Sequence, residues 1–376
     1  MTTPLARPDH RPHLIADAAD PFARGLARGR QLRTALPGGI AAYDRLFRLG
    51  GISPRQVRED AARALDAVDA FRPAARAQIE GIAHGAGADP LAVAALNART
   101  EILARSNAVP PGECSTLVRR NTDPATDAPR TFGIQTWDWH IELNPFWHTL
   151  ESRGGRHDVV GLTEHGILGK IGVNSAGLAL HFNILGHRRD GIGGVPVHVL
   201  AAVVLEEAGC VAEAVEILRG APLASSGSFA LLDPADTALL DLSPDGVFPV
   251  APANGTHIRT NHFLTPVPAA REKTWLYQPD SGERHALLRE RLAEQAPPAT
   301  PDDLVPFLVS GPGEAALTCL PDMSLPEGQR WASLATVLLE PATRTARVLD
   351  GTPAQARERR WREMRAVGTG RRHDAP

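Results

Sequence analysis

Cysteine is scarce in this chain, and lysine is nearly absent. The 376 residues include three cysteines, Cys114, Cys210 and Cys319, and two lysines, Lys170 and Lys273. So few cysteines, odd in number, exclude the disulfide framework of a small secreted domain and favour a reducing compartment. The positive charges are almost all arginines, and these are dispersed among acidic residues. A chain without a basic stripe gives no reason to expect a nucleic-acid partner.

Long apolar runs are absent as well. No segment approaches the roughly 18 uninterrupted apolar residues of a membrane-spanning helix. Residues 1–14 carry prolines and charges where a secretory signal would be apolar. The net charge of −3 at pH 7 provides no attraction to an anionic membrane. We therefore expect a cytoplasmic protein without a membrane partner.

The usual motifs for metals and phosphates are also missing. Histidines are plentiful, but they do not occur in the spacings typical of a zinc site, and no paired-cysteine motif accompanies them. The glycine-rich segment Gly191–Gly194 is not followed by the Gly-Lys-Ser/Thr of a phosphate loop. We expect neither a metal nor a cofactor.

Hydrophobic spacing divides the chain into a helical and a mixed part. The first hundred residues predict helices, and Ser53–Gln56 offers an N-cap, a proline at the first helical position and a glutamine at the capping-box position. After residue 114 short β-prone runs alternate with helices, which we place at 196–207, 211–218, 284–294 and, as a basic segment, 357–365. This order favours an α+β fold with two packed sheets and helices on their outer faces.

The segment Pro110–Thr116 reads Pro-Pro-Gly-Glu-Cys-Ser-Thr. Two prolines and a glycine hold the backbone before Cys114 out of regular structure, so we expect the preceding peptide bond to be exposed. The thiol could then attack the carbonyl of Glu113, and an N-to-S acyl shift followed by hydrolysis would free Cys114 as a new N-terminus. Cys210, within an apolar helical pattern, is interpreted as a small buried hydrophobe instead.

A cysteine at a chain's N-terminus carries its own base. A free α-amine has a pKa near 8, roughly two units below that of lysine. It can therefore accept the thiol proton near neutral pH without a histidine, as in enzymes that pair a threonine hydroxyl with its own N-terminal amine.

Several segments together resemble one family. The similarity covers the chain from about residue 20 to about residue 350. The segments are Asn97–Ile102, Glu113–Thr116, Gly133–Trp139, Thr163–Gly177, Gly172–Leu178 and Thr260–His262. Together they resemble the penicillin acyltransferase family of N-terminal-nucleophile hydrolases, which comprises the self-processing acyl-coenzyme A:6-aminopenicillanic acid acyltransferases and their bacterial amidase-like relatives.

The resemblance implies a fold and a division of the chain. The fold is the four-layer αββα arrangement of N-terminal-nucleophile hydrolases with a helical N-terminal segment. Cleavage before Cys114 would yield a light chain of residues 1–113, packed on the core, and a catalytic heavy chain of residues 114–376. Within the heavy chain, we expect residues 367–376 to be a disordered tail.

The resemblance also implies roles for single residues. Cys114 would be the nucleophile of both self-cleavage and turnover. Asp138 would accept a hydrogen bond from the new α-amine, and Asn261 would donate its side-chain amide to the oxyanion of the tetrahedral intermediate. Asn183 is a further candidate for the oxyanion site. The alternative interpretations are a turn cap for Asp138 and a loop-ordering side chain for Asn261.

Three further residues are candidates for substrate contact. These are Trp137 and Trp139, which flank Asp138, and His262, which follows Asn261. Tryptophans in such positions are more often core or wall residues than platforms for a substrate.

Two departures from the family pattern keep other functions open. Glu113 precedes the nucleophile where the family has glycine, and Leu320 follows Cys319 where the family commonly has arginine. These departures favour an uncleaved, non-catalytic binding protein on the same fold. A third hypothesis is an unprocessed Cys-His-Asp hydrolase with His140 or His262 as its base.

The leading hypothesis remains a self-processing cysteine amidohydrolase or acyltransferase. Its substrate would be a small amide or acyl thioester, and an acyl-enzyme on Cys114 would pass to water or to an amine. Hydrolysis is slightly favoured because nothing in the sequence identifies a coenzyme A site.

Overall fold

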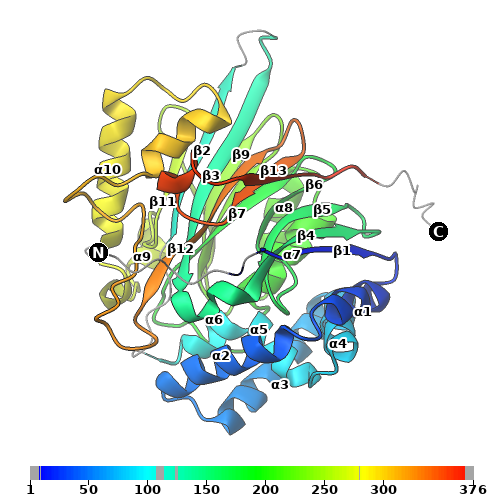
Figure 1. The fold of residues 1–376 in the computed structure, drawn as a ribbon. Coiled ribbons are helices and arrows are strands. Elements are labelled where there is room, and N and C mark those ends of the chain that lie inside the picture. The colour runs from blue at the N-terminus through cyan, green and yellow to red at the C-terminus, as the bar shows by residue number, and fades with distance from the viewer. Residues whose placement is uncertain (1–7, 9, 107–113, 123–125, 279, 369–376) are drawn as a thin grey trace.

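The computed structural model describes residues 8, 10–106, 114–122, 126–278 and 280–368 (Figure 1). Glu113 and most of the expected C-terminal tail lie outside the described residues. The N-terminal part is helical, as expected, and lies below the sheets in the view of Figure 1. Its helices are α1 (Pro21–Gln31), α2 (Leu36–Leu49), α3 (Pro54–Phe71), α4 (Pro73–Ala86), α5 (Pro90–Asn97) and α6 (Arg99–Leu103).

Within the described residues the strands form two sheets. The first has eight strands, antiparallel except for the parallel pair β1–β4, in the order β1 (His13–Asp17), β4 (Trp147–Arg153), β5 (Val159–Glu164), β6 (Ile171–Asn174), β7 (Ala179–Ile184), β8 (Gly227–Leu232), β9 (Thr237–Ser243) and β10 (Gly246–Val250). The second has six antiparallel strands in the order β11 (Thr256–Arg259), β2 (Cys114–Thr122), β3 (Pro129–His140), β12 (Trp331–Glu340), β13 (Thr345–Leu349) and β14 (Trp361–Arg365).

The sheets pack face to face, and helices cover their outer faces, which confirms the four-layer αββα arrangement. Helices α7 (Val197–Glu207) and α8 (Val211–Arg219) contact the eight-stranded sheet. The six-stranded sheet is covered by α10 (Asp280–Glu294) and the 3-10 helix η3 (Pro301–Leu308). The remaining short helices are α9 (Pro266–Ala269), η1 (Ile141–Phe146), η2 (Thr274–Leu276) and η4 (Pro353–Gln355).

Alternation along β2 explains how one strand serves two layers. Val118 belongs to the core between the sheets, whereas its neighbour Leu117 packs with Leu288 of α10 and Phe307 of η3. Because side chains alternate across a strand, Cys114 has the same parity as Val118 and faces the space between the sheets.

Local capping signals predict some helix starts correctly. Ser53 caps α3, because its side chain accepts a hydrogen bond of 3.2 Å from the backbone N–H of Gln56. The glutamine side chain does not complete a capping box, since it donates to Asp60 instead.

Three expectations about local structure are wrong. The basic segment 357–365 is not a helix but ends in the strand β14, which pairs with β13. Cys210 lies at the N-cap of α8 and is only half-buried, so it is not a core residue within a helix. Strand β1 lies within the first hundred residues, for which helices were expected.

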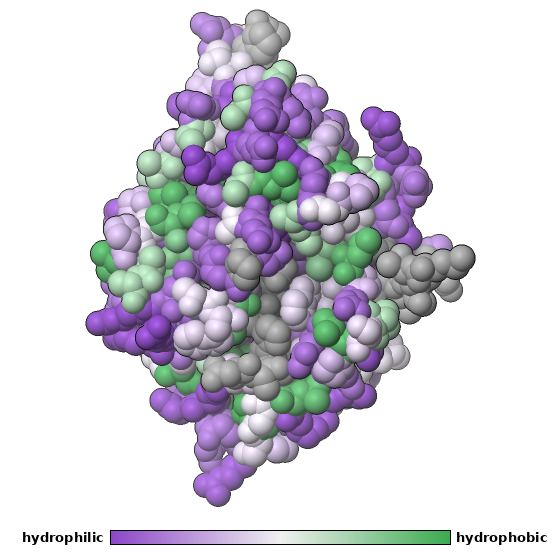
Figure 2. Space-filling model, turned by 90° about the vertical axis from the view of Figure 1, so that its left-hand side faces the viewer, coloured by the Kyte–Doolittle hydropathy of each residue, from purple (hydrophilic) through white to green (hydrophobic). Residues whose placement is uncertain are grey.

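The surface in Figure 2 shows apolar residues in small groups separated by hydrophilic ones. No helix in the described parts of the chain combines the length and apolar character needed to cross a membrane. Among the described residues, no three histidine, cysteine or acidic side chains are grouped so that they could hold a metal ion.

Candidate active site

Cys114 is the first residue of β2, and 4% of it is exposed. It pairs directly with Trp137 of β3, so the two side chains leave the sheet on the same face. Glu113, the other residue of the expected cleavage site, lies outside the described residues. Cys114 therefore lies at a strand start in the core between the sheets.

Side chains from three distant segments hold the backbone of Cys114. Its N–H donates to Oδ1 of Asn261, which follows β11, over 2.8 Å. Its carbonyl accepts hydrogen bonds from Nδ2 of Asn183 in β7, at 3.1 Å, and from Nη1 of Arg284 in α10, at 2.9 Å. The sequence analysis placed Asn183 and Asn261 near the oxyanion, and the structure brings both to the backbone of Cys114.

Arg284 is the residue that the sequence analysis missed. It is fully buried and bridges the site, because Nη2 donates to Oδ1 of Asn261 at 3.2 Å and Nη1 also donates to Ser115 Oγ at 3.0 Å. Its Nε donates to Asp280 Oδ2 at 2.6 Å. The i, i+4 spacing of Asp280 and Arg284 is visible in the sequence, but it says nothing of the contact with Cys114.

Asp138 lies beside Cys114 and is fully buried. Burial and the Asp138 carboxylate raise the pKa of the Cys114 thiol to about 12, although the backbone N–H of Asp138 donates to the sulfur and opposes the shift. The thiol of the intact chain is therefore protonated at neutral pH. Attack by the sulfur requires a base that accepts this proton.

Asn261 has one side-chain N–H engaged in the intact chain. Its Nδ2 donates to the carbonyl of Ile184 at 2.9 Å. An amide nitrogen carries two hydrogens, so a second one is available for an oxyanion beside Cys114. This geometry is compatible with the donor role that the sequence analysis expects of Asn261.

His262 is oriented toward α10. Its Nδ1 lies 2.8 Å from Ser281 Oγ and 3.2 Å from Thr260 Oγ1. Burial and the neighbouring His285 lower the pKa of His262 to about 4, so this imidazole is neutral at pH 7. No hydrogen bond within the described residues joins it to Cys114.

Two buried cations stack on the tryptophans that flank Asp138. Lys170 Nζ lies 4.0 Å from the ring centre of Trp137, and the Arg99 guanidinium carbon lies 4.0 Å from that of Trp139. Glu164 connects the cations, because its Oε1 accepts from Arg99 at 2.7 Å and from Lys170 at 2.8 Å. Arg99 belongs to the N-terminal helical segment, so this cluster links that segment to the sheets.

Glu164→Gln is expected to destabilise the protein and to reduce its acid sensitivity. Burial raises the pKa of Glu164, but Arg99 and Lys170 outweigh burial and hold it below its usual range. The stabilisation is therefore present above the unfolded pKa of about 4.3 and is lost as the pH falls below it. At neutral pH the substitution leaves two buried cations uncompensated, which costs about 3–5 kcal/mol of the free energy of unfolding.

Urea unfolding at a series of pH values between about 7 and about 3 measures both effects. The free energy of unfolding of the wild type should decrease as the pH is lowered. At low pH the free energies of unfolding of the wild type and the variant should become similar. Glu216→Gln removes an exposed partner of Arg219 and serves as the control, with an expected change within about 0.5 kcal/mol. Parallel pH curves for wild type and Glu164→Gln would contradict this account of the cluster.

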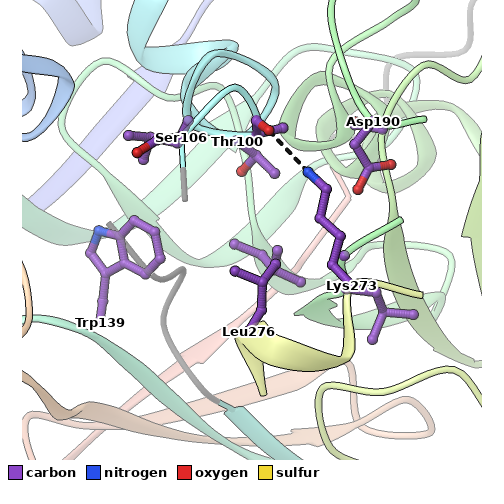
Figure 3. A pocket seen from close by; sticks show the side chains of 12 residues that line it. Thr100, Ser106, Trp139, Asp190, Lys273 and Leu276 are labelled. Atoms are coloured by element: carbon purple, nitrogen blue, oxygen red, sulfur yellow. Dashed lines mark hydrogen bonds between the residues drawn. The ribbon is translucent and has the colours of Figure 1, made fainter. Parts of the chain in front are cut away.

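Trp139 differs from Trp137 in one respect. It lines a small cavity that is partly open to solvent (Figure 3). Trp137 instead packs edge-on against Trp147, with 6.0 Å between ring centres. Of the two tryptophans, Trp139 is thus the better placed to contact a substrate.

Comparison with known proteins gives one family match. The model of the acyl-coenzyme A:6-aminopenicillanic acid acyl-transferase family matches residues 126–355. This range includes Asp138, Asn183, Asn261 and Arg284, and it begins after Cys114.

A curated relative from Emericella nidulans is the acyl-coenzyme A:6-aminopenicillanic-acid-acyltransferase 40 kDa form, which is 30% identical over 220 residues. The alignment covers 57% of this chain and 59% of the relative, so the chain spans less than two thirds of that protein.

Two solved structures are distantly similar. The Caenorhabditis elegans ortholog of N-acylethanolamine-hydrolyzing acid amidase is 15% identical, with a TM-score of 0.43 and coverage of 61% of this chain and 93% of that one. A mutant of conjugated bile acid hydrolase from Clostridium perfringens is 8% identical, with a TM-score of 0.41 and coverage of 66% and 92%.

Proposed function

Because the chain belongs to the acyl-coenzyme A:6-aminopenicillanic acid acyl-transferase family, we propose that it is a self-processing cysteine amidohydrolase or acyltransferase. Cys114 is the nucleophile of both reactions, and the substrate is a small amide or acyl thioester. One observation carries this proposal. The backbone of Cys114 is held by Asn261, Asn183 and Arg284 at the start of a buried strand.

Self-processing begins with the thiol of the intact chain. The sulfur attacks the carbonyl carbon of Glu113, the C–S bond forms and the peptide C–N bond breaks. The thiol proton goes to the nitrogen that becomes the α-amine of Cys114. Water then hydrolyses the thioester, which releases the carboxylate of Glu113 and regenerates the thiol.

Turnover uses the same atoms with the new α-amine as base. The amine accepts the thiol proton and passes it to the leaving group when the acyl–nitrogen or acyl–sulfur bond of the substrate breaks. Asn261 donates its second amide hydrogen to the oxyanion, and Asp138 orients the amine. The acyl group then moves from Cys114 to water or to an acceptor amine.

The test is to analyse purified protein by intact mass and N-terminal sequencing. We expect fragments of residues 1–113 and 114–376, the larger beginning Cys-Ser-Thr. Brief incubation with short acyl amides or acyl thioesters should add the mass of the acyl group to Cys114. A single inert chain would instead support a binding protein. A single chain that hydrolyses amides would support a Cys-His-Asp mechanism without processing.

A further inference from the structure

The cavity beside Trp139 is largely apolar but has two charged side chains at one side. Figure 3 shows Lys273 and Asp190 on the side of the cavity away from Trp139, with Leu276 between them and the indole. The apolar walls come from both parts of the chain, namely Leu103 and Ala104 of the N-terminal segment and Ile184, Leu185, Gly186 and Leu276 of the sheet region.

The cavity and the site around Cys114 have Ile184 as a common neighbour. Ile184 lines the cavity, and its carbonyl accepts the hydrogen bond from Asn261 Nδ2. The same Asn261 side chain accepts the N–H of Cys114. A substrate whose reacting carbon lies at Cys114 can therefore extend one arm past Ile184 and Trp139 into the cavity.

Lys273 is a buried cation that forms no ion pair within the described residues. It is 8% exposed, and its Nζ donates to the carbonyl of Ala104 at 2.9 Å, as Figure 3 shows. No acidic side chain of the described residues lies within 4.0 Å of this ammonium. Removing an ammonium from water costs several kcal/mol unless an anion compensates it. Lys273 can form two more hydrogen bonds, so it is ready to bind an anionic group.

Asp190 is not a full counter-charge for Lys273. Its Oδ1 accepts from Ser226 Oγ and its Oδ2 from the backbone N–H of His187, both at 2.6 Å. Burial raises the pKa of Asp190 to about 7, so this carboxyl is only about half ionised at neutral pH. Asp190 therefore compensates the charge of Lys273 only in part.

We propose that this cavity selects substrates in which the arm beside Cys114 ends in a carboxylate, and that Lys273 binds this carboxylate. The apolar walls contact the hydrocarbon between the reacting carbonyl and the acid. This inference rests on the proposed function for the position of the reacting carbon, but the anion site itself is independent of catalysis.

Matched pairs of amides test the charge requirement in each arm. Hexanoylglycine and hexanoylglycinamide differ only in a carboxylate on the amine side, and succinic monoanilide and its primary amide differ only on the acyl side. We expect the wild type to prefer the acid in one pair. Lys273→Met should lower kcat/KM for that acid about tenfold or more, because a hydrogen bond to a charged group is lost, and should leave the neutral partner nearly unchanged.

Arg188→Met is the control for general attraction of anions. Arg188 is exposed and lies over the ring of Trp275, at 5.8 Å, near the cavity but not in its lining. The acid preference should persist in this variant. Equal losses for acid and neutral substrates in Lys273→Met, or an undiminished acid preference, would overturn the proposal.

Binding separates this inference from the proposed function. Cys114→Ala protein retains every residue that lines the cavity, so calorimetry with the same pairs needs no turnover. If Cys114→Ala binds an acid more tightly than its neutral partner, and the added substitution Lys273→Met removes this difference, the anion site is supported. That conclusion holds even if the wild type hydrolyses no amide, a result that would refute only the proposed function. Equal binding of acid and neutral partner in both pairs refutes the anion site whatever turnover shows.

Discussion

Cys114→Ala is expected to accumulate as one uncut chain of 376 residues and to show no turnover. The substitution removes the sulfur that we propose as the attacking atom in both self-cleavage and turnover. Loss of a nucleophile costs on the order of 10⁶ in kcat in a serine protease, so activity should fall below detection. Intact mass and amide hydrolysis measure the two losses separately.

Two further variants separate chemistry from folding. Cys114→Ser keeps an attacking atom at the same place but a weaker nucleophile, so slow, time-dependent cleavage is expected. Cys319→Ala is the matched control, because Cys319 is also buried and its thiol donates to the carbonyl of Trp331, at 3.6 Å, away from Cys114. It should be cut and active. Normal fragments from Cys114→Ala would show that the thiol does not cleave the chain.

Much of the fold could be predicted because its signals are local. Alternating apolar residues and breakers mark most strands after residue 114, and N-caps such as Ser53 mark helix starts. Helix α2 begins at Leu36 and includes Pro37, Gly38 and Gly39 in its first turn, although glycine disfavours a helix. Such elements form because tertiary packing outweighs local preference.

The residues of the candidate site also divide into those that could be predicted from the sequence and those that could not. Cys114 was found from its neighbours in sequence, and Asp138 and Asn261 from the resemblance to a family. The structure brings Asn261 to the backbone of Cys114 across 147 positions. Arg284 and Lys273 carried no sequence signal, since what distinguishes them is burial beside other elements.

Arg284→Met is expected to cause the second-largest loss of function. Arg284 donates to the carbonyl of Cys114 and to Oδ1 of Asn261, so it fixes Cys114, the proposed nucleophile, relative to Asn261, the proposed oxyanion donor. Without the guanidinium, the Cys114 carbonyl loses one of the two side-chain donors described above and keeps Asn183. Oδ1 of Asn261 loses the hydrogen bond from Arg284, so Asn261 is held less firmly. We expect kcat to fall on the order of 10²–10³-fold, as for loss of one oxyanion-hole donor, and self-cleavage to slow.

Arg291→Met provides the comparison on the same helix. Arg291 donates to the carbonyls of Phe307 and Val309 and so holds η3 without touching Cys114. If Arg284 were merely structural, both variants would lose stability and activity alike. A positioning role predicts instead that added guanidinium partly restores kcat in Arg284→Gly but not in Arg291→Gly, with KM nearly constant. Wild-type cleavage and kcat in Arg284→Met would show that Asn183 and Asn261 position Cys114 unaided.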